Sequence, residues 1–423
     1  MLQLNIIRTE KERVMEGLKK RCFKQPELVE EILALDERHR HLKTQSDALK
    51  AEVNGASKAI SQLMRDGKKE EAETQKAAVS TLKQQQGPLQ DELQQVAGKL
   101  DALLVQLPNI PHETVPAGCS EKDNVTIKEG GVVPELSGKP LPHWELASRY
   151  QLIDFALGNK ITGSGFPVYK GAGARLQWAL IQYFLQCNIA NGYTPYQPPL
   201  LVNAETAYGT GQLPDKEGQM YAVPEDGYYL IPTAEVPLTN IYRDTILTEA
   251  DLPVKMTGYT PCFRREAGSY GKDVRGLNRL HQFDKVELVR IVHPETSYAA
   301  LEEMVAEVEQ LLKSLALPYR ILRLCGGDLG FTSAITYDFE IYSVAQQRWL
   351  EVSSVSNFET FQSNRMKIRL KDTGGKKQLL HTLNGSALAL PRILAGLLEN
   401  NQCAEGIRLP EALQPLMGTA LLN

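Results

Sequence analysis

The chain has 423 residues, of which 42% are apolar and 23% are charged, values that are ordinary for globular proteins. This length predicts two or three domains and excludes a small disulfide-held scaffold. Lysine and arginine total 47 against 51 aspartate and glutamate residues, a formal charge of −4. The chain as a whole therefore cannot attract a polyanion non-specifically, and any nucleic-acid partner must meet a local basic surface.

Segments that would export or anchor the chain are not expected. Charged residues follow residues 1–7 at once, which leaves no secretory apolar region. The apolar stretch 387–398 is broken by Pro391 and Arg392 and is shorter than the roughly 20 residues that cross a bilayer. We therefore predict a cytoplasmic protein without membrane association.

The cysteines show no pattern of a metal site. They include no C-x-x-C pair and have no histidine at ligand spacing, which suits a reducing compartment and argues against structural zinc. The six residues are Cys22, Cys119, Cys187, Cys262, Cys325 and Cys403.

A heptad pattern dominates the N-terminal quarter of the chain. Apolar residues recur every seven positions over residues 27–65 and again over residues 79–103, in the two seams of a coiled coil. A polar turn at residues 65–68 separates the runs, so we predict an antiparallel helical hairpin. At 1.5 Å per residue each helix would be roughly 50 to 60 Å long.

Two features of this hairpin need explanation. Pro88 lies inside the second helix, where the missing N–H and the ring clash cost about 3 kcal/mol or force a kink, so we expect a local break there. Residues 1–100 carry 18 basic and 16 acidic side chains, an almost neutral balance. The hairpin is either a dimerisation or spacer coil, or a rod that reaches a large partner.

A proline-containing linker at residues 107–124 separates two predicted domains, residues 1–108 with the long hairpin and residues 109–423. In the second domain, predicted helices alternate with strands that short loops join. This order favours an α+β fold on a mainly antiparallel sheet flanked by helices over a doubly wound parallel sheet. The predicted helices span residues 176–189, 298–315 and 393–400, and the predicted strands span residues 255–263, 281–291, 337–342 and 348–353.

Chemistry-bearing residues concentrate in four places, the first on a predicted strand pair. Alternation places Arg264 and Glu266 on one face, and Phe283 and Glu287 together on the return strand. Residues 264–280 hold five basic and two acidic side chains, a local positive excess. The alternative is a surface hairpin with solvated charges.

The second and third places combine hydroxyls with carboxylates. Thr233 and Glu235, two residues apart, could hold an amino group and a hydroxyl, or could form a capped turn. Glu351 and Ser354 offer oxygen ligands of the kind that suit Mg²⁺, although a polar strand end has the same composition.

The fourth place is the segment 384–386, ahead of the helix that carries Arg392. A helix start beside an arginine suits an anion, although Ser386 could be only an N-cap. Neither G-x-x-x-x-G-K-[ST] nor G-x-G-x-x-G occurs in the sequence. Any ATP must therefore bind without a P-loop.

Taken in order along one chain, these motifs resemble seryl-tRNA synthetase, a class II aminoacyl-tRNA synthetase family, over essentially the full length. Motif 3 of the class is matched with two alanines where the pattern prefers glycine and with a proline before the arginine. The matching segments are the hairpin, residues 208–214 (YGTGQLP), 232–237 (PTAEVP), 262–271 (CFRREAGSYG), 281–287 (HQFDKVE), 351–354 (EVSS) and 381–386 (HTLNGS).

The resemblance implies a homodimeric enzyme that activates L-serine with ATP to seryl-adenylate. It then transfers serine to the 3′ end of tRNA(Ser), with tRNA(Sec) as a further candidate. Mg²⁺ is implied as the cofactor that accompanies ATP. The hairpin would lie across the long variable arm of the tRNA, where RNA is read by shape and backbone.

The resemblance also assigns roles to single positions. Arg264 and Arg392 would be catalytic, on the α-phosphate with the reacting carboxylate and on the γ-phosphate respectively. Glu351 and Ser354 would hold the metal, and Glu287 would counter the ammonium group of serine. The serine-binding residues would be Thr233, Ala234, Glu235, Glu287, Asn384 and Ser386, and the ATP-binding residues would be Arg264, Arg265, Glu266, Phe283, Glu351, Val352, Ser353, Ser354 and Arg392.

Two rival functions remain open. An inactive relative that only binds tRNA or a protein is disfavoured because Arg264, Glu266, Glu351 and Arg392 are all present. A relative that aminoacylates a carrier protein is expected to lack the helical hairpin, which this sequence contains.

Overall fold

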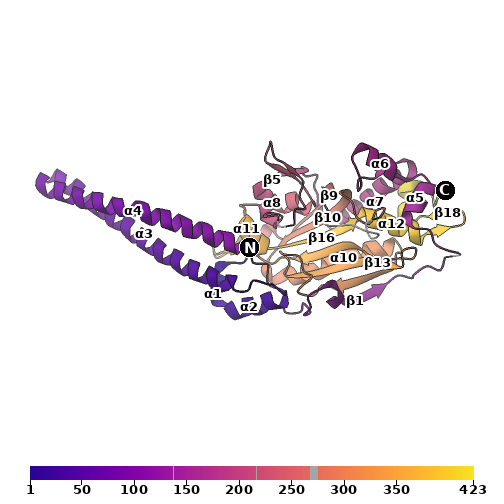
Figure 1. Ribbon diagram of the computed structural model, residues 1–423, viewed down its shortest axis with the longest axis horizontal. Coiled ribbons are helices and arrows are strands. Elements are labelled where there is room, and N and C mark those ends of the chain that lie inside the picture. Colours follow the sequence, from indigo (N-terminus) through magenta and orange to yellow (C-terminus); the bar gives the residue numbers. More distant parts are fainter. Residues whose placement is uncertain (137, 216, 267–274) are drawn as a thin grey trace. The chain divides into compact units, whose positions relative to one another are not determined.

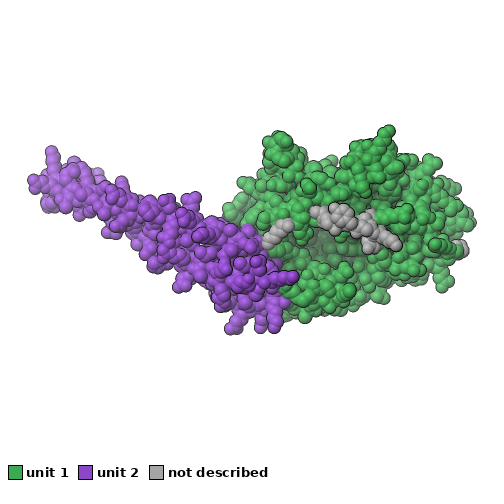
Figure 2. All heavy atoms as spheres, viewed as in Figure 1, with its two compact units in different colours: residues 1, 20–22, 109–423 green, residues 2–19, 23–108 purple. Residues whose placement is uncertain are grey.

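The computed structural model describes residues 1–136, 138–215, 217–266 and 275–423. These residues divide into two compact units (Figures 1 and 2). The first, here called the arm unit, comprises residues 2–19 and 23–108, and the second, here called the sheet unit, comprises residues 1, 20–22 and 109–423.

Two long helices form most of the arm unit. Helices α3 (Leu28–Arg65) and α4 (Lys69–Leu104) pack along each other (Figure 1). The 38 residues of α3 extend about 57 Å. The chain reverses at Gly67, whose φ of +76° is readily adopted by glycine. The predicted coiled-coil hairpin is therefore confirmed, and α1 (Leu4–Thr9) and α2 (Lys11–Lys20) precede it.

The heptad positions form the contact between α3 and α4. Leu42 and Val53 of α3 and Val79 and Leu100 of α4 are buried. Ser46 lies in the same seam at 1% exposure, and within the described residues its hydroxyl has no hydrogen-bond partner. The serine therefore weakens the seam locally, because a buried unpaired hydroxyl is unfavourable.

The expected break at Pro88 is wrong. Helix α4 continues through this residue, although proline cannot donate to the carbonyl of Gln84. Helix α3 packs along α4, and tertiary packing of an apolar face contributes more to helix stability than one backbone hydrogen bond.

A mainly antiparallel sheet forms the centre of the sheet unit, which confirms the predicted α+β class. Within the described ranges, eight strands follow the order β1-β11-β12-β13-β16-β10-β9-β4, and only β4 and β9 pair in parallel. The strands are β1 (Val125–Gly130), β4 (Thr194–Pro195), β9 (Val254–Phe263), β10 (Gln282–Val292), β11 (Tyr319–Arg323), β12 (Ile335–Ser343), β13 (Arg348–Asn357) and β16 (His381–Ala389).

Helices α7 (Gly171–Ala190), α10 (Ser297–Ser314) and α12 (Leu390–Asn400) pack against this sheet (Figure 1). They bury apolar side chains in one continuous core. The shorter helices are α5 (His143–Arg149), α6 (Phe155–Ile161), α8 (Ala204–Thr210), α9 (Glu235–Asn240), α11 (Phe361–Met366) and α13 (Gln414–Met417), and the peripheral strands are β2 (Ile153–Asp154), β3 (Val168–Tyr169), β5 (Leu201–Asn203), β6 (Ala222–Val223), β7 (Tyr228–Leu230), β8 (Ile246–Leu247), β14 (Arg369–Lys371), β15 (Lys377–Leu379), β17 (Gln402–Cys403), β18 (Gly406–Arg408) and β19 (Leu421–Leu422).

A disulfide joins Cys22 and Cys119, whose Cα atoms lie 5.7 Å apart. The scattered cysteine spacing did not predict this bond, because residues 97 apart in sequence are paired by the fold. Among the described residues, no helix combines the length and the apolar character needed to cross a membrane.

Pro88→Ala should stabilise the arm unit. The substitution restores one backbone hydrogen bond and removes the ring clash, for a gain of about 1 to 3 kcal/mol in the free energy of unfolding. Denaturation followed by far-UV circular dichroism measures the change, with Ala77→Gly, on the same helix, as a variant that should shift stability in the opposite direction. An unchanged or lower midpoint for Pro88→Ala would show that the helix has adapted to proline.

Candidate functional site

A cavity of about 540 Å³ opens on the sheet unit where β10, β13 and β16 lie side by side. Most of the predicted site residues line it, drawn from segments far apart in sequence. These are Thr233, Glu235, Arg264, Glu266, Phe283, Glu351, Val352, Ser353, Ser354, Asn384, Ser386 and Arg392.

Three predicted site residues have other surroundings. Ala234 and Glu287 are fully buried beneath the cavity. Arg265 donates its backbone N–H to Gln219 O at 2.8 Å, and its guanidinium carbon lies 5.8 Å from the centroid of the Tyr221 ring. The side chain of Arg265 is therefore engaged with an aromatic ring next to the cavity.

Strand register brings these segments together. In the paired strands, Glu287 lies opposite Ser386 of β16 on one side and opposite Gly258 of β9 on the other. Ser386 is thus a strand residue, and its suggested role as an N-cap is wrong, because α12 begins only at Leu390. Ser386 pairs with Glu287 of β10, and β16 continues beyond it to Ala389.

Polar side chains at one end of the cavity form a buried network around Glu287. Thr233 Oγ1 donates to Glu287 Oε2 at 2.9 Å, and Lys285 Nζ lies 2.5 Å from the same oxygen. Asn384 Nδ2 donates to Glu287 Oε1 at 3.2 Å and to Glu235 Oε2 at 2.9 Å. Two carboxylates, one amide and one ammonium group are therefore held in fixed positions.

Glu235 is the carboxylate of this network that reaches the cavity. Its Oε1 accepts from Gln362 Nε2 at 2.6 Å. Burial, followed by the nearby Glu287 carboxylate, raises the pKa of Glu235 to about 7. A cation bound beside Glu235 would favour its ionised form, so this end of the cavity suits an amino group.

Arginine and aromatic side chains line the middle of the cavity. The guanidinium carbon of Arg264 lies 5.2 Å from the centroid of the Phe283 ring, a cation–π arrangement that orients the arginine. Glu266 has a φ of +50°, which is uncommon for a residue with a Cβ. Its carboxylate accepts from Arg279 Nη1 at 2.8 Å. The Phe283 ring and the Arg264 guanidinium are planar groups that suit stacking of a heterocyclic base.

Side chains with oxygen atoms that can bind a metal lie at the other end of the cavity, beside Arg392. Arg392 Nη1 donates to the backbone oxygen of Glu351 at 2.7 Å. Asp338 pairs with Ser354 across the β12–β13 ladder, and burial and the Glu351 carboxylate raise the pKa of Asp338 well above its ordinary value. Within the described residues, Asp338 Oδ1 has no hydrogen-bond partner. A bound divalent cation would offset the repulsion between the Asp338 and Glu351 carboxylates.

A second cavity of about 800 Å³ adjoins the first, with Glu266, Arg279 and Leu280 in both walls. The guanidinium carbon of Arg275 lies 4.8 Å from the Trp144 ring centroid. The remaining aromatic lining residues are Phe155, Phe166 and His281, of which the last two stack with centroids 5.4 Å apart.

Two functional residues were missed at the sequence level. Lys285 lies on the predicted return strand two positions before Glu287, so alternation alone could have placed it on the same face. Gln362 contacts Glu235 from helix α11, 127 residues away in sequence. No local pattern indicates such a contact.

Two family models match this chain. The Seryl-tRNA synthetase N-terminal domain matches residues 1–111, and the tRNA synthetase class II core domain (G, H, P, S and T) matches residues 221–401. A serine–tRNA ligase of Salinibacter ruber is 51% identical over 100% of this chain and 99% of its own length.

The chain belongs to the seryl-tRNA synthetase family. A serine–tRNA ligase of Akkermansia muciniphila is 47% identical over 99% of this chain and 98% of its own length. Among solved structures of the family, seryl-tRNA synthetase from Pyrococcus horikoshii complexed with ATP has a TM-score of 0.93 at 34% identity, covering 100% of this chain and 99% of that one. The cytoplasmic enzyme of Naegleria fowleri in complex with AMP gives 0.88 at 28% identity, with the same coverage of both chains.

Glu235→Gln should flatten the pH dependence of stability. The folded pKa of about 7 exceeds the value of 4.5 for an exposed carboxyl, so the unfolded chain loses its proton first as pH rises. The free energy of unfolding should therefore fall between about pH 4.5 and pH 7, by about 2 to 3 kcal/mol in total.

The measurement is urea unfolding at pH 5 and pH 8. Glu235→Gln should show a smaller difference between the two pH values than the unsubstituted protein. Glu205→Gln, at a side chain that is 80% exposed, serves as the control and should keep the full difference. An equal difference in all three proteins would show that Glu235 titrates as an exposed carboxyl.

Proposed function

We propose that this chain activates L-serine with ATP to seryl-adenylate and transfers serine to the 3′ end of tRNA(Ser). The observation that carries this proposal is one cavity lined by Glu235 of a buried carboxylate network and by Arg264 and Arg392. Membership of the seryl-tRNA synthetase family supports the same activity. ATP is proposed to bind in this cavity, on the surface of the sheet.

The serine end of the cavity is proposed to hold the amino acid through Thr233, Glu235 and Asn384, with Glu287 beneath them. The Glu235 carboxylate would meet the ammonium group, and hydroxyl and amide groups would meet the serine hydroxyl. An alanine in the same place would leave buried polar partners unpaired, which strongly disfavours it. The buried Ala234 would then support this wall through packing.

The reaction needs charge neutralisation and in-line positioning more than proton transfer. The serine carboxylate is already ionised at neutral pH and attacks the α-phosphorus directly. Arg264 would stabilise charge on the α-phosphate and the attacking carboxylate. Arg392 would hold the γ-phosphate, and Phe283 and Glu266 would contact adenine by stacking and by accepting from its amino group.

Mg²⁺ is proposed to accompany ATP, held by Glu351 and Ser354 together with the phosphates. The unpartnered Asp338 Oδ1 and the nearby Glu351 carboxylate supply a suitable oxygen-rich surrounding. Within the described residues, no three His, Cys, Asp or Glu side chains form a ready metal cluster, which agrees with a cation that needs substrate phosphates. When bound, Mg²⁺ would neutralise phosphate charge. Val352 and Ser353 would complete this wall.

The tRNA is proposed to contact both units separately. In the arm unit, the long hairpin offers a regular surface for RNA read by shape and backbone. In the sheet unit, the cavity lined by Trp144, Phe166 and Arg275 offers ring and guanidinium planes for unpaired bases of the 3′ end.

A homodimer is proposed from an exposed apolar face of α7. Trp178 is 66% exposed and Ile189 is 47% exposed, and with Leu185 and Tyr259 they line a shallow hollow of about 330 Å³. Contiguous exposed apolar side chains of this kind mark interaction sites. A second copy of this chain is the proposed occupant.

The cytoplasm is the proposed location, because charged tRNA is used there. Disulfides are rare in reducing compartments. The proposal therefore implies that Cys22 and Cys119 carry free thiols in the cell and that their bond forms when the protein is oxidised.

Arg264→Ala should reduce serine-dependent exchange of pyrophosphate into ATP by about 10²-fold or more, the scale for losing one preorganised donor. The effect should fall mainly on kcat, because Arg264 is proposed to act on the reacting groups. Arg243→Ala, which removes an arginine outside the cavity lining, is the control. Exchange by Arg264→Ala within threefold of the unsubstituted protein would contradict this role.

Replacing residues 30–100 by a short Gly-Ser turn should separate activation from charging. Seryl-adenylate formation should persist, because every proposed site residue lies in the sheet unit. The KM for tRNA should rise at least tenfold, and the salt dependence of tRNA binding should become shallower as phosphate contacts are lost. Unchanged charging would instead show that the hairpin is a spacer coil.

A further inference from the structure

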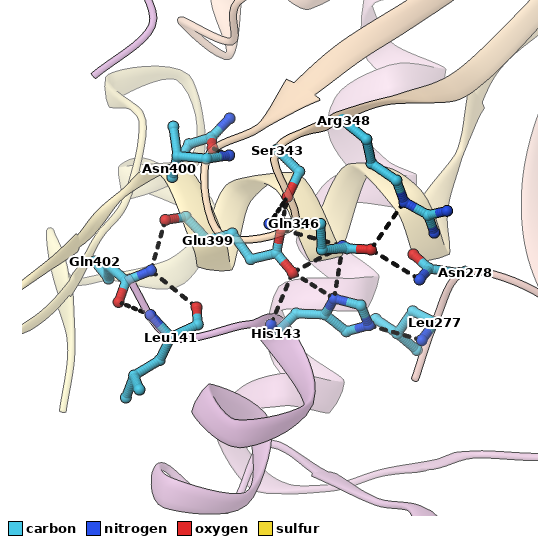
Figure 3. Close-up of polar contacts among 11 residues, drawn as sticks. Leu141, His143, Leu277, Asn278, Ser343, Gln346, Arg348, Glu399, Asn400 and Gln402 are labelled. Carbon is cyan, nitrogen blue, oxygen red and sulfur yellow. Dashed lines mark hydrogen bonds and ion pairs between the residues drawn. The ribbon is translucent and has the colours of Figure 1, made fainter. Parts of the chain in front are cut away.

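The wall between the two cavities is a segment without a helix or strand of its own. Leu277 and Asn278 line the first cavity, Arg275 and Gly276 line the second, and Arg279 lines both. Such a segment needs support from outside itself to keep one geometry. Its support is a buried polar cluster that contacts the segment at Leu277 and Asn278 (Figure 3).

At the centre of this cluster are His143, the first residue of α5, and Glu399, near the end of α12. Both side chains are fully buried. Glu399 Oε1 accepts from the backbone N–H of His143 at 2.8 Å and lies 2.6 Å from His143 Nδ1 (Figure 3). Ser343 Oγ donates to Glu399 Oε2. Burial alone would raise the pKa of Glu399, but these hydrogen bonds lower it.

The imidazole of His143 connects this pair to the cavity wall. Its Nε2 accepts from the backbone N–H of Leu277 at 2.8 Å. Because Nε2 accepts, the proton of the neutral ring is assigned to Nδ1, which donates to Glu399. The carboxylate therefore fixes both the orientation and the tautomer with which His143 holds Leu277.

Gly276 allows this close approach. Its φ is +70°, and a Cβ at this position would lie 2.2 Å from His143 Nε2. Any larger residue would displace the ring from Leu277.

Gln346 provides a second connection. Its Nε2 donates to Glu399 Oε1 at 2.9 Å, and its Oε1 accepts from Asn278 Nδ2 at 2.9 Å (Figure 3). Glu399 thus reaches Leu277 through His143 and reaches Asn278 through Gln346. Two adjacent wall residues are bonded to the same carboxylate by separate routes.

The wall in turn orients Arg392. The backbone oxygen of Asn278 accepts from Arg392 Nε at 3.1 Å, while Glu351 O accepts from Nη1 at 2.7 Å. Two carbonyls therefore fix the plane of the guanidinium. Arg392 and Glu399 lie seven residues apart on α12, so one helix carries both the arginine in the cavity and the carboxylate that supports its partner.

We propose that Glu399, His143 and Gln346 are positioning residues for ATP, which act through Leu277 and Asn278 on the guanidinium of Arg392. This inference rests on the proposed function. It differs from a purely structural role because it predicts a change in the KM for ATP and no change in the KM for serine. The serine end is held by a separate network around Glu287.

Glu399→Gln tests the proposal with little change in shape. The new amide group would face N–H and O–H donors where the carboxylate accepted, so the wall should lose its fixed position. In serine-dependent pyrophosphate exchange, the KM for ATP should rise about tenfold, and the KM for serine should stay within twofold. Gln346→Ala should raise the KM for ATP by about threefold, since the His143 route remains.

Tyr193→Phe is the matched control. The Tyr193 hydroxyl donates to Glu307 at 2.7 Å and accepts from Arg290 Nε at 2.7 Å in another buried charged network. Its loss should lower thermal stability and leave both KM values within twofold. A rise in the KM for ATP of the same size in the control would show that general destabilisation causes the effect, and would overturn the proposal.

A double variant tests the route through the arginine. Arg392→Lys has no Nε to donate to Asn278, so adding Glu399→Gln to it should change the KM for ATP by less than twofold. A further tenfold change, or an unchanged KM in Glu399→Gln alone, would overturn the proposal. If Glu399→Gln does not fold, Gln346→Ala with the same lysine variant gives the same test. Absence of exchange in the unsubstituted protein would instead count against the proposed function.

Discussion

The buried ion pair between Lys285 and Glu287 is the interaction on which the polar end of the main cavity depends. Its atoms lie 2.5 Å apart, with side chains 7% and 0% exposed. Removing one partner would leave an unpaired buried charge, at a cost of about 3 to 5 kcal/mol. Glu287 also accepts from Thr233 and Asn384. These hydrogen bonds connect the central strand β10 with side chains that line the cavity. Changes to this end of the cavity therefore affect the sheet as well.

Charged groups of both signs line the cavity. Burial raises the pKa of Glu235 to about 7, and Lys285 is paired with Glu287 nearby. Arg264 and Arg392 line the same cavity as Glu266 and Glu351. This arrangement suits a zwitterion and a polyphosphate bound next to each other, since the carboxylates complement an ammonium group and the arginines complement phosphates. A bound ammonium group would offset the burial and the repulsion from Glu287 that raise the pKa of Glu235.

Sequence patterns predicted those parts of the molecule that depend on local periodicity. The heptads of α3 and α4 bury one face of each helix, so the sequence indicates these helices directly. Strand β10 is buried on both faces from Lys285 onward, so alternation indicates there only which side chains share a face. The motifs also indicated most of the cavity lining. Contacts between distant residues were not predictable, such as His143 with Glu399, 256 positions apart. The break expected at Pro88 was wrong because packing against α3 outweighed the local preference of proline. The alternative of an N-cap at Ser386 was wrong because this residue pairs within β16.

The antiparallel hairpin of the arm unit also constrains how its length can evolve. Residues before and after the turn at Gly67 pair in register along one seam, so an insertion in α3 leaves apolar residues exposed unless α4 gains the same number. Insertions of seven residues in both helices keep every seam position in phase. The reach of the rod can therefore vary among relatives in paired heptad steps of about 10 Å, while the sheet that carries the chemistry stays unchanged.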